Sequence, residues 1–206
     1  MRTYGFPQYS DDWWSIRCGI PTASSADKIL TPTGKLSAQS EKYLNQLLAD
    51  RAGFGDPPTE PTEWMQRGTD LEPEARRFFE FDTGFEVEQV GFITNDDGTA
   101  GCSPDGLVYN DVDSGFEVKC PKASTHIGYL RGGELPPYYK PQVHFSMAVT
   151  GLDRWWFMSY YPGIDPLIVL VDRDDYTDLV GYSIAEFSKR LEAEAQRLGY
   201  GIKEAA

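Results

Sequence analysis

The sequence predicts an α/β (α+β) domain in which helices flank a mixed central sheet. Apolar residues recur with helical spacing before Phe85, alternate as in strands from Phe85 onward, and return to helical spacing near the C-terminus. The chain has 206 residues, of which 40% are hydrophobic, enough to form one sizeable core. No repeat or domain boundary interrupts it, so residues 1–206 are expected to form a single domain.

The first part of the chain, about 10–80, is predicted to be helical. Asp11 and Asp12 favour the start of a helix, and Thr and Ser residues from Thr22 onward are suited to capping the next one. Tyr43 and several leucines continue the helical spacing. The expected elements are helices over 11–19, 22–30, 37–50 and 62–80, with a Gly- and Pro-rich loop over 53–61 before the last.

The second part, about 85–172, is predicted to contain the sheet. Alternation begins at Phe85, and Asn95-Asp96-Asp97-Gly98 marks a turn. The expected elements are strands over 85–93, 100–109 and 116–119 in a meander, a helix over 138–150, and strands over 154–161 and 167–171. A last helix over 182–198 ends at Gly199.

Composition limits the classes of protein that the chain can represent. Its net charge of −13 argues against a generally DNA-binding surface, although a local cationic funnel and divalent metals can offset an acidic exterior. Three widely spaced cysteines predict neither a disulfide framework nor a zinc site. No apolar run reaches membrane-spanning length and no signal-like N-terminus is visible, so a cytoplasmic protein without membrane contact is expected.

Two carboxylates and a lysine form the most informative motif. Asp105 lies in Ser-Pro-Asp-Gly, and Glu117-Val118-Lys119 follows 12 positions later. Side chains alternate faces in a strand, so Glu117 and Lys119 share one face while Val118 points to the other. If Asp105 comes from the neighbouring strand, two carboxylates converge beside an ammonium group. They can hold a hard divalent cation, and the lysine can position a metal-bound water, as is typical of metal-dependent nucleases.

The motif has other interpretations when it is taken alone. Glu-x-Lys is common on solvated strand faces, where charges form weak cross-strand pairs. Paired acids and 14% aromatic residues would also fit a glycoside hydrolase, which leaves Lys119 without a role. An iron–sulphur nuclease would need four cysteine ligands, one more than the chain has. The abrupt end of the strand at Cys120-Pro121 and the rigid Pro-Asp-Gly turn favour a functional site.

Further motifs surround this one in a specific order. They are Trp14 with Arg17, Gly19 and Thr22-Ala23-Ser24; Arg67-Gly68 with Glu72 and Ala75-Arg76; Gly101-Cys102-Ser103-Pro104-Asp105-Gly106-Leu107; Glu117-Val118-Lys119-Cys120-Pro121; and Gln142-Val143-His144-Phe145-Ser146-Met147. Over about residues 12–172, the chain thereby resembles the lambda exonuclease (YqaJ-type viral recombinase) family, phage-type alkaline exonucleases of the PD-(D/E)xK nuclease superfamily.

The resemblance implies a restriction-endonuclease-like fold and an exonuclease. Such an enzyme degrades one strand of double-stranded DNA from its end in the 5′→3′ direction, releases 5′-mononucleotides and leaves 3′ single-stranded overhangs. It depends on Mg²⁺, for which Mn²⁺ can substitute, with two ions per site. The resemblance also implies a ring-shaped homotrimer, a single-strand annealing protein as its partner in phage recombination, and a phage or prophage gene expressed in a bacterial host.

Residue roles in the catalytic core follow from the same resemblance. Asp105, Glu117 and the main-chain carbonyl of Val118 are the implied metal ligands, an all-oxygen set that suits Mg²⁺ or Mn²⁺. Lys119 would orient the attacking water, lower its pKa or stabilise charge on the phosphate. Two more residues complete the implied catalytic set: Glu72, which could otherwise pair with Arg76 on the helix surface, and Gln142, which would bind the water or the scissile phosphate.

Arg17 and Ser24 match the family's pocket for the 5′-terminal phosphate. An arginine binds phosphate through two nitrogens, and Ser24 lies near a predicted helix start, where it could instead be a plain N-cap. Lys35 is a candidate DNA contact in the segment where the family often has a basic wedge. Asp96 or Asp97 could supply a carboxylate to a second metal, although both fit a turn better.

Several residues are not expected to take part in chemistry. His126 and His144 lack a nucleophile context, and the strand Trp155-Trp156-Phe157 is expected in the core. Two alternative functions remain: a site-specific or structure-specific endonuclease on the same fold, and a non-catalytic module that binds DNA ends. The complete set of acids and lysine argues against the second.

Overall fold

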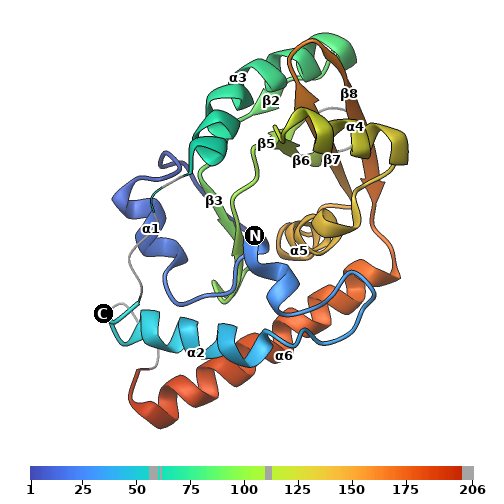
Figure 1. Cartoon of the computed structure of the whole chain (residues 1–206). Coiled ribbons are helices and arrows are strands. Elements are labelled where there is room, and N and C mark those ends of the chain that lie inside the picture. The colour runs from blue at the N-terminus through green and yellow to red at the C-terminus, as the bar shows by residue number, and fades with distance from the viewer. Residues whose placement is uncertain (56–59, 61, 110–112, 201–206) are drawn as a thin grey trace.

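Two sheets organise the protein (Figure 1). The computed structural model describes residues 1–55, 60, 62–109 and 113–200. A three-stranded antiparallel sheet has the order β1-β3-β4, and a five-stranded mixed sheet has the order β2-β5-β6-β7-β8. The strands are β1 (Arg2–Tyr4), β2 (Val87–Glu88), β3 (Phe92–Thr94), β4 (Gly101–Cys102), β5 (Gly106–Val108), β6 (Ser114–Lys119), β7 (Arg154–Tyr161) and β8 (Ile164–Asp172).

Helices cover both faces of the larger sheet, which confirms the predicted fold class. They are α1 (Asp11–Arg17), α2 (Ser40–Arg51), α3 (Glu63–Thr83), α4 (Ala123–Gly132), α5 (Lys140–Thr150) and α6 (Asp175–Leu198), with two 3₁₀ helices, η1 (Ala23–Lys28) and η2 (Pro137–Tyr139). On one face, Phe79 of α3 packs against Phe116 of β6. On the other, Met147 of α5 packs against Trp155 and Phe157 of β7.

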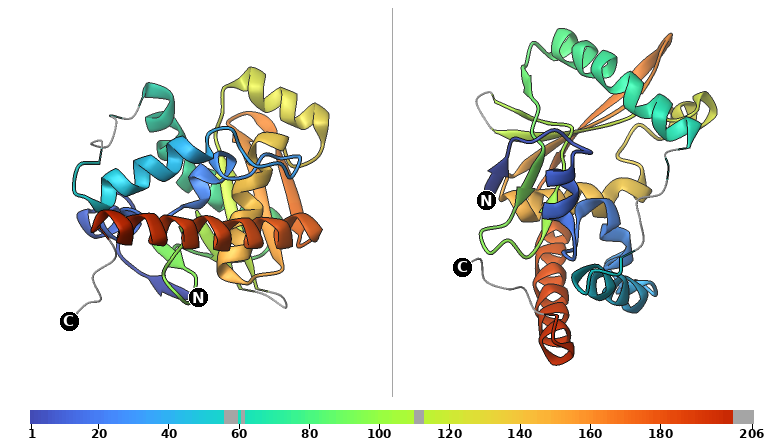
Figure 2. Two further views of the ribbon diagram at one scale, coloured as in Figure 1. Left: turned by 90° about the horizontal axis from the view of Figure 1, so that it is seen from below. Right: turned by 90° about the vertical axis from the view of Figure 1, so that its left-hand side faces the viewer.

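A second core joins the helical part to the smaller sheet. Leu44 of α2, Phe145 of α5 and Leu191 of α6 belong to one buried cluster that also contains Ile93 of β3. Figure 2 (left) shows α2 lying alongside α6, and the two helices are in contact. Among the described residues, no helix is long and apolar enough to cross a membrane.

Several predicted elements differ from the observed ones in the first half of the sheet region. The predicted strand 100–109 is two strands, β4 and β5, in different sheets, because the chain bends between them at Ser103-Pro104-Asp105. The predicted meander is therefore wrong. The predicted helix over 22–30 is a 3₁₀ helix because Ser25 has non-helical backbone angles and Thr22 pairs with Gly101. The predicted loop over 53–61 lies partly outside the described residues.

Three further elements depart from the prediction. Strand β1 and helix α4 were not predicted, and α6 begins at Asp175 rather than at 182. Helix α4 contains two glycines and β-branched residues, so its sequence has little helical propensity. It is held by the buried His126, whose Nδ1 lies 2.7 Å from the Ser159 hydroxyl and whose Nε2 lies 3.0 Å from the carbonyl oxygen of Asp165.

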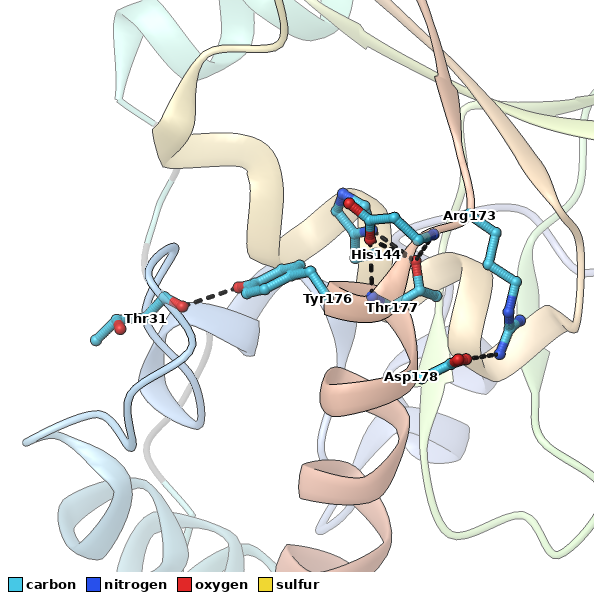
Figure 3. Close-up of polar contacts among 7 residues, drawn as sticks. Thr31, His144, Arg173, Tyr176, Thr177 and Asp178 are labelled. Atoms are coloured by element: carbon cyan, nitrogen blue, oxygen red, sulfur yellow. Dashed lines mark hydrogen bonds and ion pairs between the residues drawn. The ribbon is translucent and has the colours of Figure 1, made fainter.

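The start of α6 is fixed by a polar network (Figure 3). Asp174 caps the helix by accepting from the N–H of Thr177 at 3.1 Å, and His144 of α5 has its Nδ1 2.7 Å from the Thr177 hydroxyl. Tyr176 donates to the carbonyl of Thr31 at 2.9 Å, which ties the loop before α2 to α6. His144 therefore joins α5 to α6, consistent with a structural role.

His144 makes the stability of the protein depend on pH. Burial lowers the pKa of His144 to about 4, and the neighbouring Lys140 adds to this effect while Asp174 opposes it. The unfolded chain binds a proton near the usual pKa of about 6.5, whereas the folded protein does not until about pH 4. This contribution to stability is present above pH 6.5 and is lost as the pH falls toward 4.

We expect His144→Gln to flatten this dependence. Most carboxylates stay ionised between pH 6.5 and 5. As the pH falls through this range, the free energy of unfolding of the wild-type protein should decrease by up to about 1 kcal/mol per pH unit more than that of the variant. Chemical denaturation at a series of pH values measures the difference. Equal slopes for the two proteins would show that His144 is protonated as easily in the folded as in the unfolded chain.

Candidate active site

Strand β6 presents Glu117 and Lys119 on one face. Phe116 and Val118 point to the opposite side and belong to the buried cluster under α3. Glu117 is 3% exposed even though it is an acid, and Lys119 forms an ion pair with its Oε1 atom. The alternation predicted from the sequence is confirmed, but on this face Glu117 is buried and Lys119 is only partly exposed.

Asp105 reaches β6 from the bend between β4 and β5. Its backbone N–H donates to the carbonyl of Phe116 at 3.0 Å, and its Oδ2 accepts from the N–H of Val118 at 2.7 Å. The next residue must be glycine, since a Cβ atom at Gly106 would lie 2.2 Å from a side-chain carbon of Val87 on the adjacent β2. The carboxylate of Asp105 is thus fixed against the middle of β6.

Two residues far away in the sequence anchor the bend. Gln8 donates through Nε2 to the carbonyl of Pro104 at 3.0 Å. The buried indole N–H of Trp13 reaches the hydroxyl of Ser103 at 2.9 Å and the carbonyl of Gly91 at 3.1 Å. The N-terminal segment therefore helps to hold Asp105 in place.

Gln142 joins the pair on β6 from helix α5. Its Nε2 donates to Oε1 of Glu117 at 2.6 Å, so this oxygen receives both the amide and the ammonium of Lys119. Because two donors fix it, the carboxylate of Glu117 has a defined orientation. Tyr139, three residues before Gln142, places its ring centroid 5.5 Å from Nζ of Lys119.

The carboxylates of Asp105 and Glu117 lie close to one lysine, and burial together with these charges shifts the pKa values of Asp105 and Lys119. Burial raises the pKa of Asp105 well above its usual value, and Glu117 raises it further, although Lys119 and the N–H of Val118 oppose the rise. Burial disfavours the charged form of Lys119 as well, but Glu117 and Asp105 outweigh it, and the pKa of Lys119 is raised. The lysine is thus a cation at neutral pH.

Glu72 adds a third carboxylate from α3. It lines a cavity of about 440 Å³ together with Asp105, Arg76 and Gln8. Burial raises the pKa of Glu72 and Glu117 adds to the rise, while Lys119 and Arg76 oppose it. Within the described part of the chain, Glu72 and Arg76 form no ion pair, so the surface pair that helical spacing allows is not present.

The donor set fits a hard divalent cation. Two ionisable oxygens converge from Asp105 and Glu117, and burial makes their negative charge costly without a compensating cation. The N–H and C=O of one strand residue point to the same edge, so the carbonyl of Val118 faces the side of Asp105. Across the described ranges, His, Cys, Asp and Glu side chains form no cluster of three at metal-binding distance. A cation here would have two carboxylates and a carbonyl rather than a closed cage.

Arg17 of α1 and Ser24 of η1 lie together, as predicted. Nη2 of Arg17 donates to the hydroxyl of Ser24 at 3.3 Å, and the guanidinium carbon lies 3.8 Å from the ring centroid of Trp13. Burial lowers the pKa of Arg17 to about 10, while Tyr43 opposes this effect, so Arg17 remains charged at neutral pH. Among the described residues it has no carboxylate partner, which leaves it able to bind an anion.

Other predicted residues lie apart from this cluster. Lys35 is exposed at the end of a turn closed by a hydrogen bond from its backbone N–H to the Thr31 hydroxyl at 3.1 Å, and within the part of the chain described it touches no member of the site. Asp96 is 86% exposed on its side chain and pairs with the N-terminal amine at 2.5 Å. Asp97 lines a separate cavity beside α6, so this turn adds no carboxylate to the Asp105–Glu117 cluster.

The sequence motifs did not point to Gln8, to Tyr139 or to the role of Trp13. All three act through contacts between segments far apart in the chain or through ring placement. Helical spacing could have indicated Tyr139. It lies three positions before Gln142, and residues at this spacing share one side of a helix.

Comparison with known proteins identifies a family for the chain. A family model for the YqaJ-like viral recombinase domain matches residues 12–153. The structure is similar to that of an alkaline exonuclease (LHK-Exo) from Laribacter hongkongensis, with a TM-score of 0.80 and 32% identity over 92% of this chain and 96% of that one. A search of curated proteins found no match.

Two further solved structures are similar. LHK-Exo in complex with dAMP gives a TM-score of 0.74 and 30% identity over 92% of this chain and 98% of that one. A phage-related exonuclease from Haemophilus somnus 129PT gives a TM-score of 0.59 and 14% identity over 85% of this chain and 96% of that one, which supports the fold alone. The family match covers more than half of the chain and includes Asp105, Glu117 and Lys119. The protein therefore belongs to the YqaJ-like viral recombinase family.

Proposed function

We propose that the protein is a Mg²⁺-dependent 5′→3′ exonuclease that degrades one strand from the end of double-stranded DNA, releasing 5′-mononucleotides and leaving 3′ overhangs. The observation that carries the proposal is the convergence of Asp105, Glu117, Lys119 and Gln142 from separate elements at one buried point. The relative LHK-Exo is an alkaline exonuclease, and its complex with dAMP contains a nucleoside monophosphate, the kind of product that such cleavage would release.

The proposed roles follow from the geometry. Asp105, Glu117 and the Val118 carbonyl would hold Mg²⁺ or Mn²⁺, up to two ions, which when bound activate water and stabilise the leaving oxygen. Lys119, a cation at neutral pH, would stabilise negative charge that builds on the scissile phosphate. Gln142 holds Glu117 in one orientation. Glu72, beside Asp105 in the cavity, would bind the attacking water.

Strand polarity would come from the Arg17–Ser24 pair. Among the described residues the guanidinium of Arg17 has no carboxylate partner and lies next to two hydroxyls, which suits a terminal phosphate. Trp13 connects Arg17 to the bend that carries Asp105, so the two sites are held at a fixed separation. Binding of each new 5′-phosphate would then place the next bond at the metal site.

Assembly and partners are part of the same proposal. Family membership favours a homotrimeric ring around the DNA and a single-strand annealing protein as partner in phage recombination, in the cytoplasm of a bacterial host. A ring would also reconcile DNA binding with a net charge of −13, since cations need only line its channel.

We expect Arg17→Ala to reduce activity mainly on 5′-phosphorylated ends. Loss of a charged hydrogen-bond donor to phosphate corresponds to about a 10- to 100-fold lower kcat/KM. The same linear duplex with 5′-hydroxyl ends should be cut at nearly the same rate by variant and wild type. Arg190→Ala, which removes an exposed arginine of α6 that pairs with Glu41 of α2, is the matched control. Equal losses on both kinds of end would argue against a phosphate pocket.

An exonuclease needs a DNA end and an endonuclease does not, so DNA with and without ends distinguishes the two activities. Linear duplex DNA and covalently closed circles of the same sequence are incubated with the protein and Mg²⁺. We expect the linear DNA to be degraded and the circles to stay intact. Efficient cutting of closed circles would refute the exonuclease proposal in favour of an endonuclease on the same fold.

A further inference from the structure

An aromatic ring is exposed between two cations at the N-terminal end of α3. Trp64 is 51% exposed. Nζ of Lys122 lies 4.4 Å from its ring centroid, and the guanidinium carbon of Arg67 lies 5.9 Å from it. Arg67 also lies 4.8 Å from the ring of Tyr161 on β7. We refer to Trp64, Arg67, Lys122 and Tyr161 as the Trp64 platform.

The Trp64 platform adjoins the catalytic strand. Nη1 of Arg67 donates to the carbonyl of Cys120 at 3.5 Å, and Cys120 directly follows Lys119. Lys122 is the N-cap residue of α4, three positions after Lys119. In the right-hand view of Figure 2, the N-terminal end of α3 lies beside α4. A nucleotide chain leaving the active site past the end of β6 would meet this surface.

The charges of the platform favour a polyanion. The protein has a net charge of −13, yet neither Arg67 nor Lys122 forms an ion pair with any acid in the described part of the chain. Unpaired cations attract phosphates, and an exposed indole offers a flat apolar face. Bases inside a duplex keep both faces covered by stacking, so such a face favours an unpaired base over an internal base pair.

We propose that the Trp64 platform binds an unpaired nucleotide of the DNA next to the active site, with the base on the Trp64 ring and its phosphates on Arg67 and Lys122. This inference rests on the proposed nuclease function and names a residue that would hold the strand during cleavage. It accounts for why a large apolar side chain remains exposed on a helix whose other face is buried in the core.

Binding of single-stranded DNA tests the inference. The probe is a labelled 5′-hydroxyl oligothymidylate of about 12 nucleotides, with EDTA present to prevent cleavage, and a blunt duplex is measured in parallel. We expect Trp64→Ala to weaken binding of the oligonucleotide about 5- to 100-fold, and Trp64→Phe to weaken it far less. Arg67→Ala and Lys122→Ala should each reduce the slope of log binding constant against log salt concentration by the amount expected for about one phosphate contact.

The control is Phe81→Ala, which removes a 90% exposed aromatic ring from the same helix, away from the platform. Oligonucleotide binding unchanged in Trp64→Ala, an equal loss in Phe81→Ala, or an equal loss for the blunt duplex would each overturn the inference. If Trp64→Ala weakens binding but the wild-type protein hydrolyses no DNA, the platform stands and the proposed function fails. If the wild type is an active exonuclease and Trp64→Ala binds normally, the inference alone fails.

Discussion

Lys119→Ala should abolish hydrolysis of linear duplex DNA, with a loss of at least about 10³-fold in kcat. The reason is the position of the ammonium, which is paired with Glu117 and has its pKa raised by Glu117 and Asp105 against the effect of burial. No other described cation pairs with Glu117, so none can take over this charge. Steady-state hydrolysis with Mg²⁺ measures the loss.

Binding of DNA ends should remain in the same variant, within about threefold of wild type, since Arg17 and Ser24 are untouched. Lys189→Ala, an exposed lysine on α6, serves as the matched control and should keep full activity. Because Glu117 is buried and loses its cation, the melting temperature of Lys119→Ala must be recorded too. Wild-type activity in a folded Lys119→Ala protein would refute the proposed site.

Asp105→Asn should reduce hydrolysis about as much as Lys119→Ala does. The same variant also distinguishes the effect of Asp105 on metal binding from its effect on stability. The asparagine keeps an oxygen for the N–H of Val118 but loses the charge that a divalent cation needs. Burial and Glu117 raise the pKa of Asp105, so its ionised form destabilises the fold at neutral pH. In EDTA we therefore expect the variant to melt about 2–4 °C higher than wild type, equivalent to roughly 1 kcal/mol.

Addition of Mg²⁺ should reverse this order. A ligand at ten times its dissociation constant adds about 1.4 kcal/mol to stability, so wild type should gain about 3–5 °C while Asp105→Asn gains little. Asp97→Asn, in the turn after β3, is the matched control and should respond to Mg²⁺ like wild type. A full Mg²⁺-induced shift in Asp105→Asn would show that the cation binds elsewhere.

Much of the fold could be predicted because its periodic elements are long. The alternation in β6 and the helical spacing in α3 and α5 each depend on one segment and are visible in one window of sequence. The Pro-Asp-Gly turn at Asp105 is visible in the sequence, but the division of 100–109 between two sheets was missed, because the residues on both sides of the turn read as one strand. Helix α4 was missed because it owes its stability to His126 and the strands beneath it rather than to propensity.

The site could be predicted only in part for a related reason. The Asp105 and Glu117-x-Lys119 motif indicated two acids and a lysine, but not that Glu117 would be buried or held by Gln142. Contacts such as Gln8 with Pro104 join residues 96 positions apart, and no local pattern encodes them. The exposed Trp64 between two cations likewise depends on α3 and α4 being brought together by the fold.

The direction of degradation tests the central claim most directly. Linear duplex DNA carrying a label at either the 5′ or the 3′ end is digested with Mg²⁺, and early release of each label is compared. A 5′→3′ exonuclease should release the 5′ label first, as a mononucleotide, while the 3′ label stays on long single strands. Early release of the 3′ label, or of labelled fragments many nucleotides long from both ends, would contradict the proposed function.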